Sequence, residues 1–285
     1  MKRIYFFLIF VLSLCSCEDV IEVDAPSEPP RLTVDALIRL DTSVAFTTAI
    51  IKVGLSSSFF DSNDVADVDQ MIIQNLDYEP TSPLDQNFII FRETEPGIFQ
   101  GSKDTSFFTS GNLFLNINYG DERYFASTRF VPSVPIDNLE QGDGTLFTGD
   151  ETEIMVSFTD NADRDDFYLF DFDFDEYLVT EDEFYQGQTF EFSYFYDDGI
   201  ESGRTLEISI LGVDEPFYNY MNQLIVQSGG DQGPFQTPAA TVRGNIINVT
   251  DIDNMEVFDN VEENDNFALG YFAVVQEFKE TITIE

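Results

Sequence analysis

Few residues in this chain have a type and spacing that support specific chemistry, and the clearest of them is Cys17. It ends the stretch Leu14-Cys15-Ser16-Cys17, which follows the basic residues Lys2 and Arg3 and the apolar run 4–14. A basic start, an apolar middle too short to span a bilayer and a small residue before a cysteine predict an export signal and not a transmembrane helix. We expect the Cys17 thiol to receive a diacylglycerol, with cleavage before it and acylation of the freed amine.

Cys17 fits a lipoprotein signal better than Cys15 does. Ser16 is small enough for the peptidase subsite before the cleaved bond, whereas Leu14 would fill that subsite if Cys15 were the lipid acceptor. The alternative is an ordinary secretory signal that contains cysteines by chance. The lipoprotein signal predicts removal of residues 1–16 and attachment to outer-membrane lipid through Cys17.

A second candidate site is the acidic loop 160–166. Its oxygen-bearing side chains stand at alternate positions, a spacing that hard cations such as calcium favour. The loop lacks the following glycine and the distal glutamate of a helix-loop-helix calcium site, so a solvated turn between strands is the alternative. The candidate calcium ligands are Asp160, Asp163, Asp165 and Asp166.

A row of aspartates follows on the strand predicted over residues 167–177. Alternation puts phenylalanines on one face and aspartates on the other, with Phe170, Phe172 and Phe174 opposite Asp171, Asp173 and Asp175. These aspartates are interpreted as a solvated strand face and not as a ligand set.

The residue inventory excludes most catalytic arrangements. The chain has no histidine, which excludes Ser-His-Asp and Cys-His nucleophiles and imidazole metal sites. It has no Gly-x-Ser-x-Gly elbow and no phosphate-binding glycine loop. A carboxylate pair could hydrolyse a glycoside, but 54 acidic residues bring such pairs together by chance. We therefore predict a protein that is not an enzyme and has no catalytic residues. Carbohydrate stacking on Tyr and Phe stays open, although the chain has no tryptophan.

The charge balance restricts the partners. The chain has 13 basic and 54 acidic residues, and removing residues 1–16 takes away Lys2 and Arg3 alone, so the net charge moves from −41 to −43. So much negative charge excludes nucleic acid as a natural partner. Both cysteines lie at the signal, so the exported part has no disulfide and depends on its cores for stability.

The rest of the chain predicts an all-β fold of two antiparallel β-sandwich-like domains, with one helix in the second. An acidic, Pro-rich stalk over residues 17–30 precedes an N-terminal domain over residues 31–131. The stretch Val131-Pro132-Ser133-Val134-Pro135 forces an extended passage, and a C-terminal domain over residues 136–285 follows it. Short alternating runs predict strands over 32–38, 46–53, 71–74, 88–92, 113–118, 123–130, 153–158, 167–177, 189–196, 205–211, 269–275 and 277–284.

One helix is predicted near residues 214–226. Asp214 can cap it and Pro216 suits its first turn. Its apolar stripe, which we expect to dock on the second sheet, consists of Phe217, Tyr220, Met221, Leu224 and Ile225.

Short landmarks along the exported chain add a family resemblance. They are the segments 17–24 and 30–34, Tyr124-Phe125-Ala126-Ser127-Thr128, Phe167-Tyr168, Phe217-Tyr218-Asn219-Tyr220, Pro234-Phe235 with Pro238, and Leu269-Gly270-Tyr271-Phe272. In this order they resemble the Bacteroidota lipoproteins grouped as domain of unknown function 4249. The chain departs from that pattern in its acidity and in a shorter, more degenerate loop around Gly244-Asn245.

The resemblance implies an envelope lipoprotein that is typically encoded beside a TonB-dependent outer-membrane receptor, and it implies no catalytic residues. We therefore expect a lipid-anchored outer-membrane lipoprotein that is a non-enzymatic accessory or ligand-binding subunit of a TonB-dependent uptake system. A structural or adhesive cell-surface protein is the alternative. The acidic pair Glu18 and Asp19 directly after the anchor resembles a surface-export signal, which predicts exposure at the cell surface.

Overall fold

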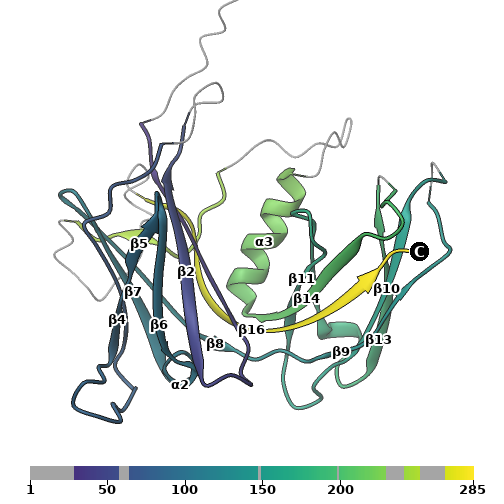
Figure 1. Ribbon diagram of the computed structural model, residues 1–285, viewed down its shortest axis with the longest axis horizontal. Coiled ribbons are helices and arrows are strands. Elements are labelled where there is room, and N and C mark those ends of the chain that lie inside the picture. The colour runs from purple at the N-terminus through teal and green to yellow at the C-terminus, as the bar shows by residue number, and fades with distance from the viewer. Residues whose placement is uncertain (1–28, 58–63, 147–148, 198, 229–240, 251–266) are drawn as a thin grey trace, which may run out of the picture.

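Two β-rich units stand side by side in the structure, a computed structural model that describes residues 29–57, 64–146, 149–197, 199–228, 241–250 and 267–285. Figure 1 shows helix α3 (Glu215–Ser228) between the units and strand β16 (Leu269–Thr283) running from one into the other. This arrangement confirms the predicted all-β, sandwich-like fold class with a helix in the second unit. Within the described residues, no helix is long and apolar enough to cross a membrane.

The N-terminal unit packs two groups of strands around one apolar core. Its elements are β1 (Leu32–Leu40), β2 (Phe46–Leu55), β3 (Gln70–Asn75), β4 (Phe88–Ile90), β5 (Arg92–Glu95), β6 (Ile98–Asp104), β7 (Asn112–Tyr119), β8 (Glu122–Val131), β15 (Ile247–Asn248) and the short helix α2 (Thr105–Thr109). One group follows the order β16-β1-β2-β6-β5 and the other β4-β3-β7-β8. Every second residue of β1 is buried in the core. The face that the alternating sequence predicts to be buried is therefore the buried face.

The C-terminal unit has an aromatic core between two smaller groups of strands. Its elements are β9 (Ile136–Gln141), β10 (Thr152–Thr159), β11 (Phe167–Asp171), β12 (Tyr177–Glu181), the 3₁₀ turn η1 (Asp182–Phe184), β13 (Thr189–Tyr196) and β14 (Thr205–Val213). The strands pair in the orders β13-β10-β9 and β12-β11-β14-β16. Phe158 on β10 lies at the centre, with the Tyr168 and Phe170 rings of β11 at centroid distances of 5.2 and 5.5 Å.

Strand β16 belongs to both units, and its residue pattern changes where it crosses between them. Residues 269–276 pair in parallel with β1, and residues 277–283 pair antiparallel with β14. The first part is apolar on both faces, because Phe272 packs into the N-terminal core while Tyr271 packs under α3. The second part is mainly polar, and its apolar residues Phe278 and Ile282 lie on one face and pack against the C-terminal core. A strand covered on both faces needs a continuous apolar run, whereas a strand covered on one face needs alternation.

This shared strand changes two sequence-based expectations. The tail that the sequence divides into two closing strands is one strand. Residues 269–276, assigned from sequence to the domain 136–285, lie in the N-terminal unit, and their pairings with β1 and β8 are parallel. The reason is that alternation reports which faces of a strand are covered, but not which strand lies beside it.

The strand predicted over residues 167–177 is a hairpin instead. Strand β11 ends at Asp171, and Asp173, Phe174 and Asp175 have φ values of 65°, 52° and 62°. The Asp171 carboxylate accepts a hydrogen bond from the backbone N–H of Asp173 at 3.1 Å, which is a local turn contact typical of aspartate. The expected row of aspartates on one strand face is therefore wrong, because two of its three members lie in the turn.

Helix α3 begins at the predicted place. The Asp214 carboxylate accepts a hydrogen bond from the backbone N–H of Phe217 at 2.9 Å, as expected of a capping residue. Phe217 is 3% exposed, and its ring lies 4.8 Å from that of Tyr271 on β16. Leu224, one turn from the end of the helix, is only half-buried. The helix is thus anchored by its first turns.

We predict that truncation of α3 side chains weakens the protein in the order of their burial. Phe217→Ala should lower the free energy of unfolding by about 3–5 kcal/mol, as for other buried aromatics. Leu224→Ala should cost about 1 kcal/mol because less apolar surface is involved. Asn222 is exposed, and Asn222→Ala should stay within about 0.5 kcal/mol. Urea unfolding measures all three, and an equal loss at Phe217 and Leu224 would contradict this view of the helix.

Candidate functional site

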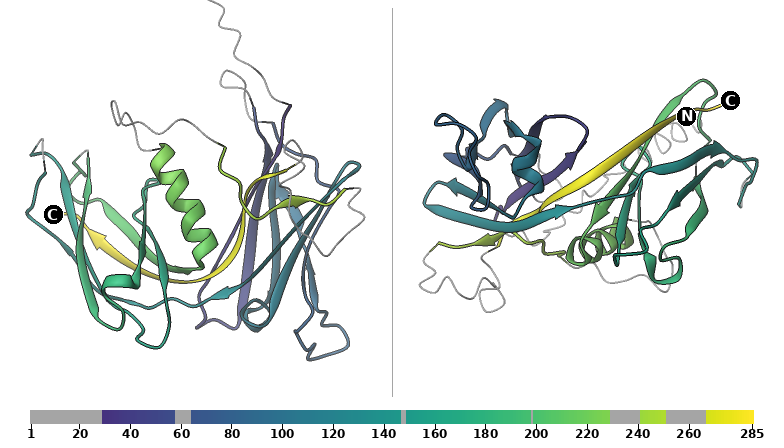
Figure 2. Two further views of the ribbon diagram at one scale, coloured as in Figure 1. Left: turned by 180° about the vertical axis from the view of Figure 1, so that it is seen from behind. Right: turned by 90° about the horizontal axis from the view of Figure 1, so that it is seen from below.

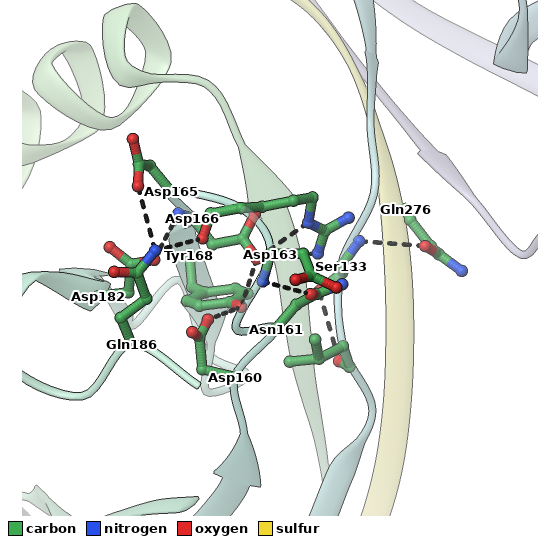
Figure 3. Close-up of polar contacts among 12 residues, drawn as sticks. Ser133, Asp160, Asn161, Asp163, Asp165, Asp166, Tyr168, Asp182, Gln186 and Gln276 are labelled. Atoms are coloured by element: carbon green, nitrogen blue, oxygen red, sulfur yellow. Dashed lines mark hydrogen bonds and ion pairs between the residues drawn. The ribbon is translucent and has the colours of Figure 1, made fainter. Parts of the chain in front are cut away.

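The predicted calcium loop connects β10 to β11 and closes on the hydroxyl of Tyr168, as Figure 3 shows. The hydroxyl oxygen lies 2.5 Å from Asp160 Oδ1 and 3.1 Å from Asp166 Oδ2. Asp160 also accepts a hydrogen bond from the backbone N–H of Gly187 at 2.7 Å. Both carboxylates are buried, with 5% and 6% exposure, and both are bonded by groups of the protein itself.

Neighbouring groups act on the charge of Asp166 in opposite directions. Burial raises its pKa above the usual range, and Arg164, whose Nη2 lies 2.9 Å from Oδ2, lowers it without cancelling the rise. Burial and the two carboxylates raise the pKa of Tyr168, so its hydroxyl is protonated at neutral pH and acts as a donor. Tyr168 is therefore a shared internal partner of Asp160 and Asp166.

The other two predicted calcium ligands lie on the outside of the loop. Asp163 and Asp165 are exposed, and the Asp165 carboxylate accepts a hydrogen bond from Gln186 at 3.2 Å. The structure thus brings Asp160 and Asp166 together on Tyr168 and leaves Asp163 and Asp165 apart from them. Among the described residues, no three His, Cys, Asp or Glu side chains are grouped so that they could hold a metal ion. Calcium binding at this loop stays a prediction.

Tyr168→Phe removes the side-chain donor that Asp160 and Asp166 share. We expect a loss of about 1–3 kcal/mol in the free energy of unfolding at neutral pH, because buried carboxylates lose a partner. The Asp166 pKa is raised in the folded state, so the stability linked to its protonation is full below its unfolded pKa and is lost as pH rises through the folded pKa. Removing the hydroxyl raises that pKa further, so the deficit should shrink as the pH is lowered.

Urea unfolding across the acidic range measures this deficit. Tyr218→Phe is the matched control, because the Tyr218 hydroxyl has no hydrogen-bond partner in the described part of the chain. A Tyr168→Phe deficit that is constant with pH, or that the control reproduces, would contradict the shared donor.

A cleft of about 450 Å³ lies between α3 and the outer face of β1 and β2. The left view of Figure 2 shows α3 between the two units, beside β16. Leu37 and Ile50 reach the cleft because they alternate with the core residues of their strands. Tyr177 on β12 and Tyr271 on β16 also line it, together with four members of the helix stripe, Phe217, Tyr220, Met221 and Leu224. The cleft is thus built from both units and is mainly apolar and aromatic.

Three charged side chains line the cleft, and they are held differently. Arg39 on β1 forms ion pairs with Asp171 on β11 at 2.7 Å and with Glu277 on β16 at 3.1 Å. Burial lowers the Arg39 pKa, but the two carboxylates outweigh this effect and the net pKa is raised. Lys52 lies 3.8 Å from Asp35, and both side chains are about two-thirds exposed, at 67% and 62%. Arg39 is therefore a structural cation, whereas Lys52 is only loosely paired.

Two tyrosine hydroxyls supply further polar groups to the cleft. Neither Tyr220 nor Tyr271 has a hydrogen-bond partner for its hydroxyl within the described residues. The described chain also contains no buried side-chain oxygen or nitrogen without a partner, so both hydroxyls reach solvent-accessible space. Burial raises the pKa of both residues, with smaller contributions from Asp35 at Tyr220 and from Asp214 at Tyr271. Both hydroxyls are therefore protonated donors at neutral pH.

This cleft was not predicted from the sequence. The available signal was the helix stripe, which continues through Met221 and Leu224 although those residues are only half-buried. The opposite wall could not be found, because the outward face of β1 and β2 has no pattern that identifies α3 as its neighbour.

Comparisons with known proteins identify the family. A comparison with curated proteins gave no match. The family model described as Domain of unknown function (DUF4249) matches residues 18–281, which include both units, the acidic loop and every residue that lines the cleft. The match begins directly after Cys17 and extends through nearly all of β16. On this match, which covers most of its length, the chain belongs to the DUF4249 family.

Proposed function

We propose that this protein is a lipid-anchored lipoprotein of the outer membrane, exposed at the cell surface, that captures a ligand for a TonB-dependent uptake system. The observation that carries the ligand-capturing part is the cleft between α3 and the β1–β2 face. Small-molecule sites are concave and mostly apolar, with a few polar groups that orient the ligand, and volumes of about 300–1,000 Å³ are usual. The cleft has this composition and a volume of about 450 Å³.

The support for the anchor is the export signal that ends at Cys17, which lies outside the described residues. Pro29 and Pro30 lead into β1 and are exposed, as expected for the end of a stalk. A Pro-rich stalk acts as a semi-rigid spacer between a folded domain and its attachment point.

The charged groups that line the cleft are of the kind that bind a ligand and not of the kind that catalyse a reaction. Asp35 is the one carboxylate among the described residues that line it, and Asp35 is mostly exposed. General acid–base catalysis needs a proton donor and acceptor with tuned pKa values at the reacting atoms. A single exposed carboxylate beside a lysine offers recognition, not a matched acid and base.

The TonB-dependent receptor enters the proposal through the family resemblance. The alternative of a structural or adhesive surface protein has one observation in its favour: Leu84 and Phe184 are 94% and 85% exposed. Isolated exposed apolar residues are common on soluble domains, so this observation is weaker than the cleft. Co-purification with a barrel from detergent-solubilised membranes favours the uptake role, and its absence favours the structural role.

Cys17→Ser should release the protein from the membrane fraction, because it removes the lipid acceptor while every folded element stays unchanged. Cell fractionation with detection of the protein in each fraction measures this. A Cys17→Ser variant that stays in the membrane fraction would contradict the lipid anchor.

Protease shaving of intact cells tests the surface assignment separately. The wild type should be degraded, and Glu18→Ala with Asp19→Ala should protect the protein by retaining it in the periplasm. Matched controls are lysed cells, in which both forms should be cut equally. A wild-type protein that survives shaving faces the periplasm.

A further inference from the structure

We propose that the cleft binds a small amphipathic anion, with its apolar body between α3 and the β1–β2 face and its acidic group at Lys52. This inference rests on the proposed function, since it names the chemical class of ligand for the same cleft. The occupant is thus a molecule with one carboxylate or similar acidic group on a hydrocarbon or aromatic body.

The charged groups that line the cleft differ in proportion from those of the whole chain. The whole chain has 54 acidic against 13 basic residues. Among the charged side chains that line the cleft, Arg39 and Lys52 are basic and Asp35 alone is acidic. Asp171 and Glu277 already balance the charge of Arg39, so Lys52 is the cleft cation that an anion can meet. Salt at physiological strength screens the acidic groups that lie more than about 8 Å from it.

The lining of the cleft supplies several hydrogen-bond donors. The Lys52 ammonium and the Tyr220 and Tyr271 hydroxyls all belong to residues that line the cleft. An ammonium has donors and no acceptor, and a protonated tyrosine hydroxyl is a donor as well. The Arg39 guanidinium is already paired with Asp171 and Glu277, so it is not counted among the donors open to a ligand. The open polar groups thus favour a ligand rich in acceptors over one rich in donors.

Most of the cleft wall is apolar. The Phe217, Tyr220 and Tyr271 rings lie 4.8–6.0 Å from one another and form one aromatic surface. Ile50 faces the same space and is 46% exposed, which leaves apolar surface that a ligand could remove from water. A fully hydroxylated sugar would place most of its hydroxyls against this surface without partners, so a hydrocarbon or aromatic body fits better.

A head-group series on one hydrocarbon body tests the proposal. Decanoate, decanol and decylamine share the same apolar chain, and isothermal titration of the folded, delipidated protein in physiological salt compares their affinities. We expect decanoate to bind most tightly and decylamine least. Lys52→Gln should weaken decanoate about tenfold and leave decanol unchanged, since one charge-assisted contact is lost. Arg92→Gln is the control, because Arg92 is exposed on β5 and makes the same change in net charge outside the cleft.

The outcomes separate this inference from the function on which it rests. Equal affinity for decanoate and decanol, tighter binding of decylamine, or no effect of Lys52→Gln would overturn the anion assignment and leave ligand capture standing. Met221→Trp, which adds bulk to the cleft wall, should abolish decanoate binding at an unchanged Tm. Binding that survives Met221→Trp places decanoate elsewhere and overturns the inference. If none of the three molecules binds the wild type, the ligand-capturing function fails as well.

Discussion

One strand, β16, is hydrogen-bonded to both halves of the molecule. The position of α3 relative to β1 and β2, on the two sides of the cleft, depends on this strand. Its first part is the parallel neighbour of β1, and its second part is the antiparallel neighbour of β14. Polar contacts fix the point of crossing: Gln276 accepts a hydrogen bond from the backbone N–H of Ser133 at 3.0 Å, and Glu277 pairs with Arg39. Because one wall of the cleft comes from each half, its shape follows from this strand and from these contacts.

The close fit of β16 to its neighbours depends on two small details of sequence. Gly270 has φ of +104°, and a Cβ at this position would lie 1.9 Å from the Val34 carbonyl oxygen, so only glycine fits there. The Asn245 side chain makes the two backbone hydrogen bonds to Phe272 that a neighbouring strand would make. Its Nδ2 donates to the Phe272 carbonyl and its Oδ1 accepts from the Phe272 N–H, both at 2.8 Å. Gly270 and Asn245 thus place the aromatic part of β16, including the cleft residue Tyr271.

The faces of the strands could be predicted from sequence, whereas their neighbours could not. Alternation in β1 correctly identifies the buried side, because burial on one face needs only a local pattern. The turn at Asp173 to Asp175 was missed because alternating Phe and Asp mimic a strand, while aspartate also tolerates a left-handed backbone. Strand β6 was missed because its polar residues and Gly101 hide its alternation.

The candidate sites show the same limit. The sequence places Asp160 and Asp166 in one loop, but the partner that they share, Tyr168, lies outside the predicted loop. The cleft could not be predicted without knowing that α3 faces β1 and β2, which are far from it in sequence. Lys52 and Asp35 look like ordinary exposed residues of two strands until the helix is placed opposite them.

Native-state hydrogen exchange on the wild type and Gly270→Ala tests most directly whether β16 joins the two halves into one body. The substitution lies beside β1, and overpacking against backbone should lower stability by at least about 1 kcal/mol. If the halves share β16 as one cooperative unit, the amides of β1 and β14 should lose the same free energy of opening. Wild-type protection of the β14 amides, with loss confined to β1, would contradict the account.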